Sequence, residues 1–254
     1  MPSRSRSTRA KDGSGEGIYA GPDPATDAVA VAGPGTPFTE INPQFTAMNN
    51  GGVVAFSATL ADTRMGIFTA NRGGPTTHIA TNALAFGSFA PPQINDFGLV
   101  AFAATTPGGS ERIVTAGVGV SPLTVATAGG AYAGFYVAEQ TNYFVDINNA
   151  GTVVFHARLR DGGHGIFTGN DPVADKLIAV DDVLFGQRVT AVNFRHGGLN
   201  DLGQLAFSYT LADGRSGVAI ATPVPEPGAA AVAAGSCLLL WRRRRMVRPA
   251  GPTR

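Results

Sequence analysis

The residues best suited to acid–base or metal chemistry in this chain are four histidines, His78, His156, His164 and His196. Only His156 and His164 flank a common turn, next to Asp161, where they could approach each other across a hairpin. A structural zinc site takes four ligands, and no other part of the chain carries a matching pair. We therefore predict that the chain has no metal site.

The acidic residues also give no recognisable site. Asp171 and the pair Asp181-Asp182 could bind calcium loosely, but their spacing matches neither an EF-hand loop nor a calcium-binding nonapeptide. The chain lacks a Gly-x-Ser-x-Gly motif, a His-Glu-x-x-His motif and a phosphate-binding loop. We predict that it has no catalytic residues, binds no cofactor and is not an enzyme. A secreted hydrolase is the least favoured alternative, because it needs paired carboxylates on one loop face.

One stretch combines aromatic rings with an amide, a combination suited to carbohydrate recognition. Its residues are Tyr132, Phe135, Tyr136, Asn142 and Tyr143. A carbohydrate-binding protein is therefore the first alternative to the function that we derive below.

Composition favours many short strands over helices. The 254 residues include 34 Gly and 17 Pro, 44% are hydrophobic and 15% are charged. Such a chain can bury a core, and its turn residues suit an all-β fold. Residues 13–241 carry 9 basic and 17 acidic side chains, a net charge of −8, which argues against a nucleic-acid partner. Cys237 is the only cysteine, so no intrachain disulfide can form.

A repeated Asn-x-x-Gly turn, followed by apolar residues that end in phenylalanine, organises the chain. It occurs four times, with separations of 46, 53 and 52 residues between the asparagines. The asparagine, glycine and phenylalanine of the four copies are Asn49, Gly52 and Phe56; Asn95, Gly98 and Phe102; Asn148, Gly151 and Phe155; and Asn200, Gly203 and Phe207. Because asparagine caps such a turn and glycine adopts a positive φ in it, we predict a structural role for these residues.

After each glycine the sequence alternates with a period of two, which indicates a strand with a large-residue face and a small-residue face. In the first copy Val54 and Phe56 lie on the large face, and Ala55 and Ser57 lie on the small face. Large faces can nest on small faces when successive sheets pack together.

Each copy predicts four antiparallel strands in about 50 residues. A second strand returns at Gly66-Ile67-Phe68 and its equivalents, a third follows at Ile79-Ala80, and a fourth precedes each asparagine, as at Tyr143–Ile147. This is the size of a propeller blade. We predict an all-β fold of tandem four-stranded repeats, propeller-like and not necessarily complete, with a C-terminal hydrophobic helix. A β-solenoid is the runner-up.

The motif resembles the tandem NxxGxxAF repeats of a family of bacterial surface proteins with a variable choice of anchor. The resemblance covers residues 17–222. It implies a surface location and no particular molecular activity.

The end of the chain combines three features in a fixed order. A Pro-Glu-Pro motif is formed by Pro225, Glu226 and Pro227, an uncharged apolar stretch by residues 228–241, and a basic cluster by Arg242, Arg243, Arg244 and Arg245. The positive-inside rule places the arginines on the cytoplasmic side of a membrane. As a helix the apolar stretch spans about 21 Å, less than a bilayer core of about 30 Å, and snorkelling of the arginines covers part of the gap.

This order resembles the PEP-CTERM sorting signal of Gram-negative bacteria. The resemblance implies transient anchoring in the inner membrane through residues 228–241 and processing by an exosortase, a membrane-embedded transpeptidase that cuts near the Pro-Glu-Pro. It also implies delivery to the cell surface or extracellular matrix, where exopolysaccharide is a further candidate partner. We therefore predict an exported protein with a structural or adhesive role.

The predicted boundaries are an unstructured or wrongly assigned N-terminus at 1–16, a β-repeat domain at 17–222, the sorting signal at 223–245 and a basic tail at 246–254. Gly17-Ile18-Tyr19 matches the second strand of a repeat, but residues 1–11 carry no Val-Ala-Phe pattern and no apolar signal-peptide core. We hypothesise that the assigned start lies too late or that the gene is truncated. The alternative is ring closure, in which N-terminal strands complete the last repeat.

Overall fold

The computed structural model describes residues 6–9, 16–82, 86–135 and 145–223 of the chain. The chain divides into two compact units, residues 1–221 and 222–254, and nearly all of the second lies outside the described residues. The described residues form strands and turns without a helix, so the predicted all-β fold is confirmed for them. The predicted C-terminal helix lies outside the described residues.

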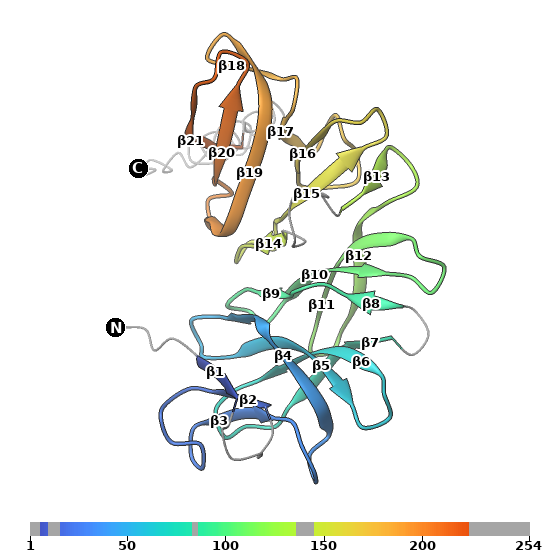
Figure 1. Ribbon diagram of the computed structural model, residues 1–254, viewed down its shortest axis with the longest axis vertical. Coiled ribbons are helices and arrows are strands. Elements are labelled where there is room, and N and C mark those ends of the chain that lie inside the picture. Colours follow the sequence, from blue (N-terminus) through green and yellow to red (C-terminus); the bar gives the residue numbers. More distant parts are fainter. Residues whose placement is uncertain (1–5, 10–15, 83–85, 136–144, 224–254) are drawn as a thin grey trace, which may run out of the picture. The chain divides into compact units, whose positions relative to one another are not determined.

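The strands form five antiparallel sheets, which we number in chain order (Figure 1). The first sheet has β1 (Arg6–Arg9), β2 (Glu16–Tyr19) and β3 (Ala28–Val31). The second has β4 (Phe38–Met48), β5 (Val54–Leu60), β6 (Met65–Ala70) and β7 (Thr77–Thr81). The third has β8 (Ser88–Phe89), β9 (Gln93–Ile94), β10 (Val100–Thr105), β11 (Glu111–Gly117) and β12 (Val120–Thr127).

The last two sheets complete the series. The fourth has β13 (Tyr132–Gly134), β14 (Val145–Ile147), β15 (Val153–Leu159), β16 (His164–Phe167) and β17 (Lys176–Ala179). The fifth has β18 (Val183–Leu184), β19 (Gln187–Leu199), β20 (Leu205–Leu211) and β21 (Ser216–Ala221).

The second, third and fourth sheets use the predicted connectivity, whereas in the fifth the last described strand is the returning strand β21 and the fourth strand, β18, pairs with β19. A strand that ends before the asparagine pairs with the strand that bears the phenylalanine, which pairs in turn with the returning strand of the hairpin. The motif glycines adopt the predicted positive φ, from 75° at Gly203 to 81° at Gly151. The third and fourth sheets have five strands because the strand before the asparagine is split, into β8 and β9 and into β13 and β14.

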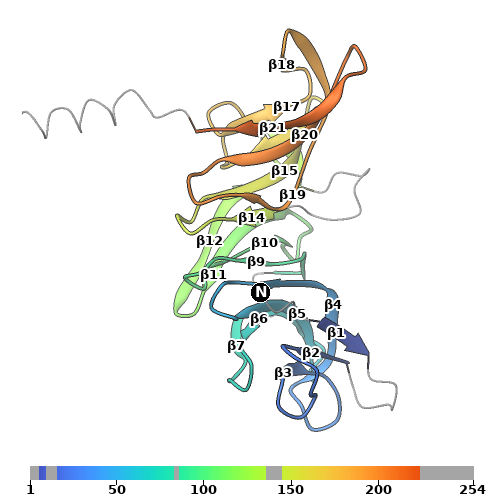
Figure 2. The ribbon, with the colours of Figure 1, turned by 90° about the vertical axis from the view of Figure 1, so that its left-hand side faces the viewer.

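The hydrophobic cores lie between consecutive sheets. Figure 2 shows the order of these sheets along the molecule. The four motif phenylalanines each point back toward the preceding sheet: Phe56, Phe102, Phe155 and Phe207. On the opposite face of the same strands, Ala55, Ala101 and Val154 enter the next core along the chain. The predicted nesting of a large face on a small face therefore occurs at each junction between complete sheets, where it excludes water from both faces.

The N-terminal prediction needs correction. Residues 1–16 were expected to be unstructured, but β1 forms within them and pairs with β2 over four residues. The prediction failed because β1 lacks the Val-Ala-Phe pattern, and a strand can be held by backbone pairing without it. The positions of β2 and β3 agree with the second and third strands predicted for this partial repeat.

Candidate functional site

The Asn-x-x-Gly turn has the same hydrogen bonds in all four copies. The asparagine Oδ1 accepts from the backbone amide four residues later, at 2.9–3.0 Å, in Val53, Leu99, Thr152 and Gln204. The motif glycine also donates its backbone amide to the asparagine carbonyl at 3.0–3.1 Å. The asparagine therefore caps its own turn, as predicted.

The same asparagines also connect the sheets, which the sequence did not reveal. The Nδ2 atoms of Asn49, Asn95 and Asn148 each donate to the backbone carbonyl of the next motif asparagine, at 3.0 Å in every case. We call Asn49, Asn95, Asn148 and Asn200 the inner ladder. Its first three side chains are buried, so loss of these bonds would leave buried polar groups without partners.

The residues that follow these asparagines form a second, exposed set of bonds. We call Asn50, Asp96, Asn149 and Asp201 the outer ladder. The backbone amides of Asn50, Asp96 and Asn149 each donate to the side chain of the next member, at 2.7–2.8 Å. Asn50 Nδ2 donates to Asp96 Oδ2 at 2.8 Å.

Asn149 joins the two carboxylates of the outer ladder. Its Nδ2 donates to Asp96 Oδ2 at 2.9 Å and to Asp201 Oδ2 at 3.0 Å. Hydrogen bonds from the Asn50 backbone, the Asn149 side chain and the Asn50 side chain lower the pKa of Asp96 below its ordinary value. The alternation of amide and carboxylate thus pairs every acceptor-only group with donors and places an amide between the two carboxylates.

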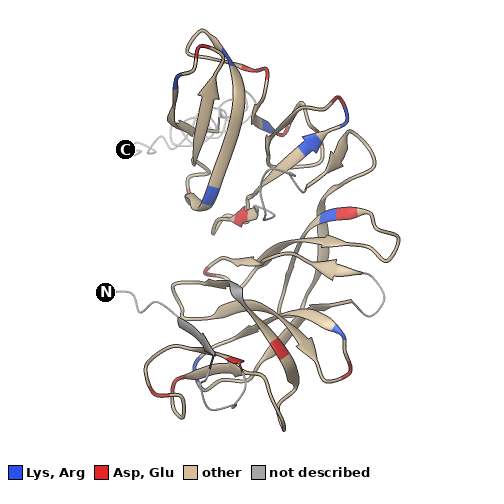
Figure 3. Ribbon diagram, in the orientation of Figure 1, with Lys and Arg blue, Asp and Glu red and all other residues tan. Residues whose placement is uncertain are grey.

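The ladders line an open groove of about 320 Å³. Its walls are the eight ladder residues and the four residues that precede the asparagines, Met48, Ile94, Ile147 and Leu199. Asp96 and Asp201 are its only charged residues. Two apolar turn-tip side chains, Phe97 and Leu202, are exposed on the same turns. Charged residues are otherwise thinly spread over the described strands (Figure 3).

The two hairpin histidines do approach each other, as the sequence suggested. The ring centroids of His156 and His164 lie 5.4 Å apart with perpendicular planes. His156 is buried, and neither ring nitrogen has a hydrogen-bond partner. Burial, and to a lesser degree the charge of His164, lowers the pKa of His156 to about 4. Among the described residues no group of three or more His, Cys, Asp or Glu side chains is placed to hold a metal ion.

The acidic residues considered for calcium are engaged in turns. Asp171 Oδ1 accepts from the backbone amides of Val173 and Ala174, which lowers the pKa of Asp171. Asp182 accepts from the Ala179 amide and pairs with Lys176.

A buried carboxylate that sequence reasoning missed joins the fourth sheet to the fifth. Asp146 Oδ2 accepts from the backbone amides of Gly197 at 2.9 Å and Leu199 at 3.3 Å. Burial raises the pKa of Asp146, although these hydrogen bonds oppose the effect. The available signal was an aspartate between Val145 and Ile147 in an apolar strand.

The aromatic stretch proposed for carbohydrate does not form a surface patch in the described residues. Tyr132 and Phe135 are buried in the core between the third and fourth sheets, where both pack against Phe155. Tyr132, on the first strand of its sheet, pairs with Leu159, as Phe38 pairs with Leu60 in the second sheet, so it takes a regular core position. Tyr136, Asn142 and Tyr143 lie outside the described residues.

The sorting residues Pro225, Glu226, Pro227 and Arg242 to Arg245, and the apolar residues 228–241, also lie outside the described residues. Within the described part, no helix has the length and apolar character needed to cross a membrane.

Comparison with known proteins adds one similarity. Residues 168–231 match the model of a family of unknown function, DUF7453. The matched stretch includes β17 to β21 and the Asn200 turn, and it continues past the Pro-Glu-Pro motif. No curated protein matches the chain.

Proposed function

We propose that this chain is an exported repeat protein of the cell surface or extracellular matrix, with a structural or adhesive role. One observation carries the proposal: the polar residues repeated in the four turns are bonded to one another from sheet to sheet. Their repeated chemistry stabilises the stack of sheets and leaves few polar groups free to act on a substrate. A repeat fold of this kind needs no disulfide to survive outside the cell.

The finer architecture that we propose is propeller-like, with each complete sheet acting as one blade. Three features support it. The second to fifth sheets share the pairing of the strands on either side of the Asn turn and of the returning strand, a large face nests on a small face at each junction, and the Asn turns lie together at the groove. A solenoid would be expected to use shorter rungs than these four- and five-stranded sheets.

The proposed route to the surface rests on the sequence of the tail. Residues 228–241 would anchor the chain transiently in the inner membrane, with Arg242 to Arg245 on the cytoplasmic side. An exosortase would then cut near Pro225-Glu226-Pro227. Exopolysaccharide is the candidate partner after release.

The route can be tested in the native bacterium, with the gene at its own locus so that any upstream coding sequence is retained, in strains with and without the exosortase. We expect the exosortase-positive strain to carry the protein at its surface without the peptides that follow the Pro-Glu-Pro, as read by mass spectrometry. Replacing Pro225, Glu226 and Pro227 with alanine should leave the uncut form in the inner membrane, whereas Pro252→Ala should be processed normally. Intact chain in the cytosol of the exosortase-positive strain would refute the proposal.

Carbohydrate binding remains the second candidate, on a different observation from the one first considered. The groove presents amides and carboxylates, and Phe97 is 81% exposed beside it. Aromatic rings and amides are suited to sugar faces and hydroxyls. A glycan array should reveal a ligand whose binding is lost in Phe97→Ala and retained in Val173→Ala, a variant at another exposed apolar residue.

A hydrolase is supported by spacing but not by electrostatics. Because Asp96 and Asp201 both bind Asn149 Nδ2, their Oδ2 atoms lie within about 6 Å of each other. Retaining glycosidases place their two catalytic carboxyl groups about 5–5.5 Å apart. A general acid needs a raised pKa, whereas the pKa of Asp96 is lowered. We therefore propose that the pair is structural and that purified chain releases no reducing sugar from polysaccharides.

A further inference from the structure

Among the described residues, the outer face of the fifth sheet is exposed at positions that are buried in every preceding sheet. Ile67, Ile113 and Ile166 occupy the same place on the returning strand, and each is 0% exposed. The equivalent residue of the fifth sheet, Val218, is 74% exposed, and Ile220, two residues further on, is 66% exposed. An exposed apolar face at a place where the fold otherwise forms an interface indicates a binding surface.

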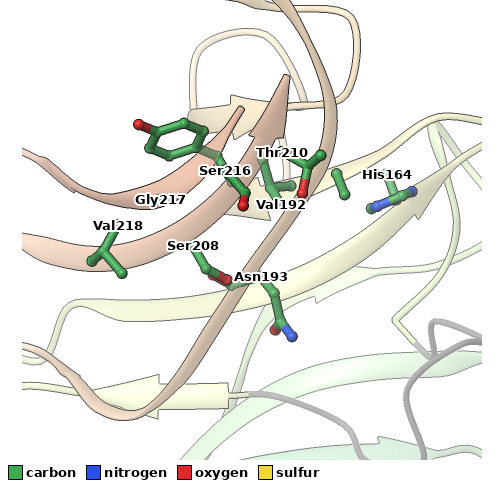
Figure 4. A pocket seen from close by; sticks show the side chains of 10 residues that line it. His164, Val192, Asn193, Ser208, Thr210, Ser216, Gly217 and Val218 are labelled. Carbon is green, nitrogen blue, oxygen red and sulfur yellow. The ribbon is translucent and has the colours of Figure 1, made fainter. Parts of the chain in front are cut away.

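The exposed face is also hollowed. A cavity of about 470 Å³ opens across β19, β20 and β21, with Asn193, Ser208 and Val218 along it and His164 at one end (Figure 4). Asn193 Oδ1 is buried there without a hydrogen-bond partner. In the preceding sheets the equivalent small-residue face receives the large face of the next sheet.

The inner ladder also ends at the fifth sheet. The first three asparagines donate to the next repeat, whereas Asn200 Nδ2 donates to Gln204 Oε1 within its own turn, at 2.9 Å. Two kinds of contact that join each sheet to the next therefore end at the fifth sheet: the apolar packing of its outer face and the hydrogen bond of the inner ladder.

The first sheet offers the complementary surface. A Cβ at Gly17 would meet the Tyr19 ring, just as a Cβ at Gly66 would meet Phe68, so Tyr19 lies on the face that bears the large residues. Phe68 is buried against the preceding sheet, whereas Tyr19 is only part-buried. The neighbouring residue Ile18 points the opposite way, into the core shared with the second sheet.

The internal junctions show which residues would meet. Each core contains the isoleucine position of one sheet and the Phe68-type position of the next: Ile18 with Phe68, Ile67 with Val114, and Ile113 with Phe167. We propose that copies of this chain stack head to tail, with Val218 of one copy against Tyr19 of a second copy. Such a heterologous contact builds a filament or a closed ring of chains. The inference concerns purified protein and does not depend on export.

The test is site-specific crosslinking of the full-length chain in mild detergent. In a Cys237→Ser background, Tyr19→Cys and Val218→Cys are placed in copies that carry different tags, and a short bismaleimide is added. We expect a mixed dimer only when the two variants are combined. The exposed internal pair Asn50→Cys and Asp96→Cys in one chain, whose parent side chains are hydrogen-bonded between the second and third sheets, serves as the positive control for geometry, and Val173→Cys as the exposed negative control.

Every other outcome would overturn the proposal. No mixed dimer, in the presence of a positive internal control, would mean that the two faces do not meet. A Val218→Cys homodimer would indicate a tail-to-tail contact. A crosslink within one chain that carries both variants would indicate ring closure. With the native cysteine retained, a Val218→Cys crosslink to Cys237 of the same chain would show that the C-terminal segment covers the face.

An independent measurement is sedimentation velocity. Val218→Asp combined with Ile220→Asp should weaken self-association at least tenfold, because two charges would be buried in an apolar contact. Val173→Asp should leave it unchanged. Both variants alter exposed residues, so thermal unfolding should be close to that of the parent chain. Equal association of the two variants would contradict the proposal.

Discussion

The second and fifth sheets have nearly the same design and very different surroundings. In the second sheet the small face, with Ile67 at its centre, is sealed by the third sheet. In the fifth sheet the same positions face outward, and Val218 is exposed. The comparison teaches that burial in this repeat fold depends on the neighbouring sheet, because each repeat supplies only one wall of each core. The predictions below test that dependence.

The largest expected effect is at a motif phenylalanine between two sheets. Phe102→Ala should lower the free energy of unfolding by about 3–5 kcal/mol, because the ring is fully buried and its removal leaves a cavity. Phe97→Ala, five residues away on the exposed turn, should change it by less than about 0.5 kcal/mol. Urea unfolding followed by far-ultraviolet circular dichroism measures both. Similar losses for the two variants would mean that the core between the second and third sheets is not formed.

The second largest effect on the free energy of unfolding depends on pH and comes from His156, at the junction between the fourth and fifth sheets. The pKa of His156 falls from an ordinary 6.5 to about 4 on folding, so the unfolded chain binds the proton first as the pH decreases. Between pH 6.5 and 4 this group should lower the free energy of unfolding by up to about 3 kcal/mol, and above pH 6.5 it should have no effect.

The variant His156→Ala isolates this contribution, because the equivalent residue of the third sheet is Ala103. Unfolding curves at several pH values should show a shallower loss of stability on acidification in the variant than in the parent chain. Val173→Ala, at an exposed residue that does not titrate, is the control and should keep the slope of the parent. An unchanged slope in His156→Ala would contradict the burial of this ring against the fifth sheet.

A smaller loss of stability should distinguish Asn95, in the middle of the inner ladder, from Asn200 at its end. Asn95→Ala removes the acceptor for the Leu99 amide and the donor to the Asn148 carbonyl, and the Asn95 side chain that makes both bonds is buried. We expect a loss of about 2–3 kcal/mol in the free energy of unfolding. Asn200→Ala should cost less than about 1 kcal/mol, because water can replace the bonds of this exposed side chain.

Asn95→Asp then distinguishes the two roles of the ladder. It keeps the Oδ1 acceptor that caps the turn but loses the Nδ2 donor that reaches the next sheet. We expect most of the Asn95→Ala loss to persist in this variant, measured by the same urea unfolding. Full retention of stability would mean that the asparagine acts only within its own turn.

The repeat fold could largely be predicted from the sequence because its signals are local. Asn-x-x-Gly turns and period-two alternation depend on backbone conformation and burial of one face, and both are written in short stretches such as Asn49 to Phe56. The capping role of the asparagines and the positive φ of the glycines followed from the same reasoning. β1 was missed because its strand pairing has no matching side-chain pattern.

The contacts between repeats could not be predicted in the same way. The bond from Asn95 Nδ2 to the Asn148 carbonyl spans 53 residues, and its existence depends on how the sheets stack. A partial signal was present, since each motif asparagine is followed by Asn or Asp, the residues of the outer ladder. Tyr132 and Phe135 were assigned to a surface because the register of the strand before the Asn148 turn could not be read from the local pattern. The structure pairs Tyr132 with Leu159, the core position that Phe38 takes beside Leu60.

The most direct test of the account compares equivalent positions in the second and fifth sheets. Ile67→Ala and Val218→Ala should be measured by urea unfolding at a low protein concentration, where copies of the chain are separate. We predict that Ile67→Ala lowers the free energy of unfolding by about 2–5 kcal/mol and that Val218→Ala changes it by less than about 0.5 kcal/mol. Equal losses at the two positions would contradict the account, because they would mean that the face of the fifth sheet is already covered within a single chain.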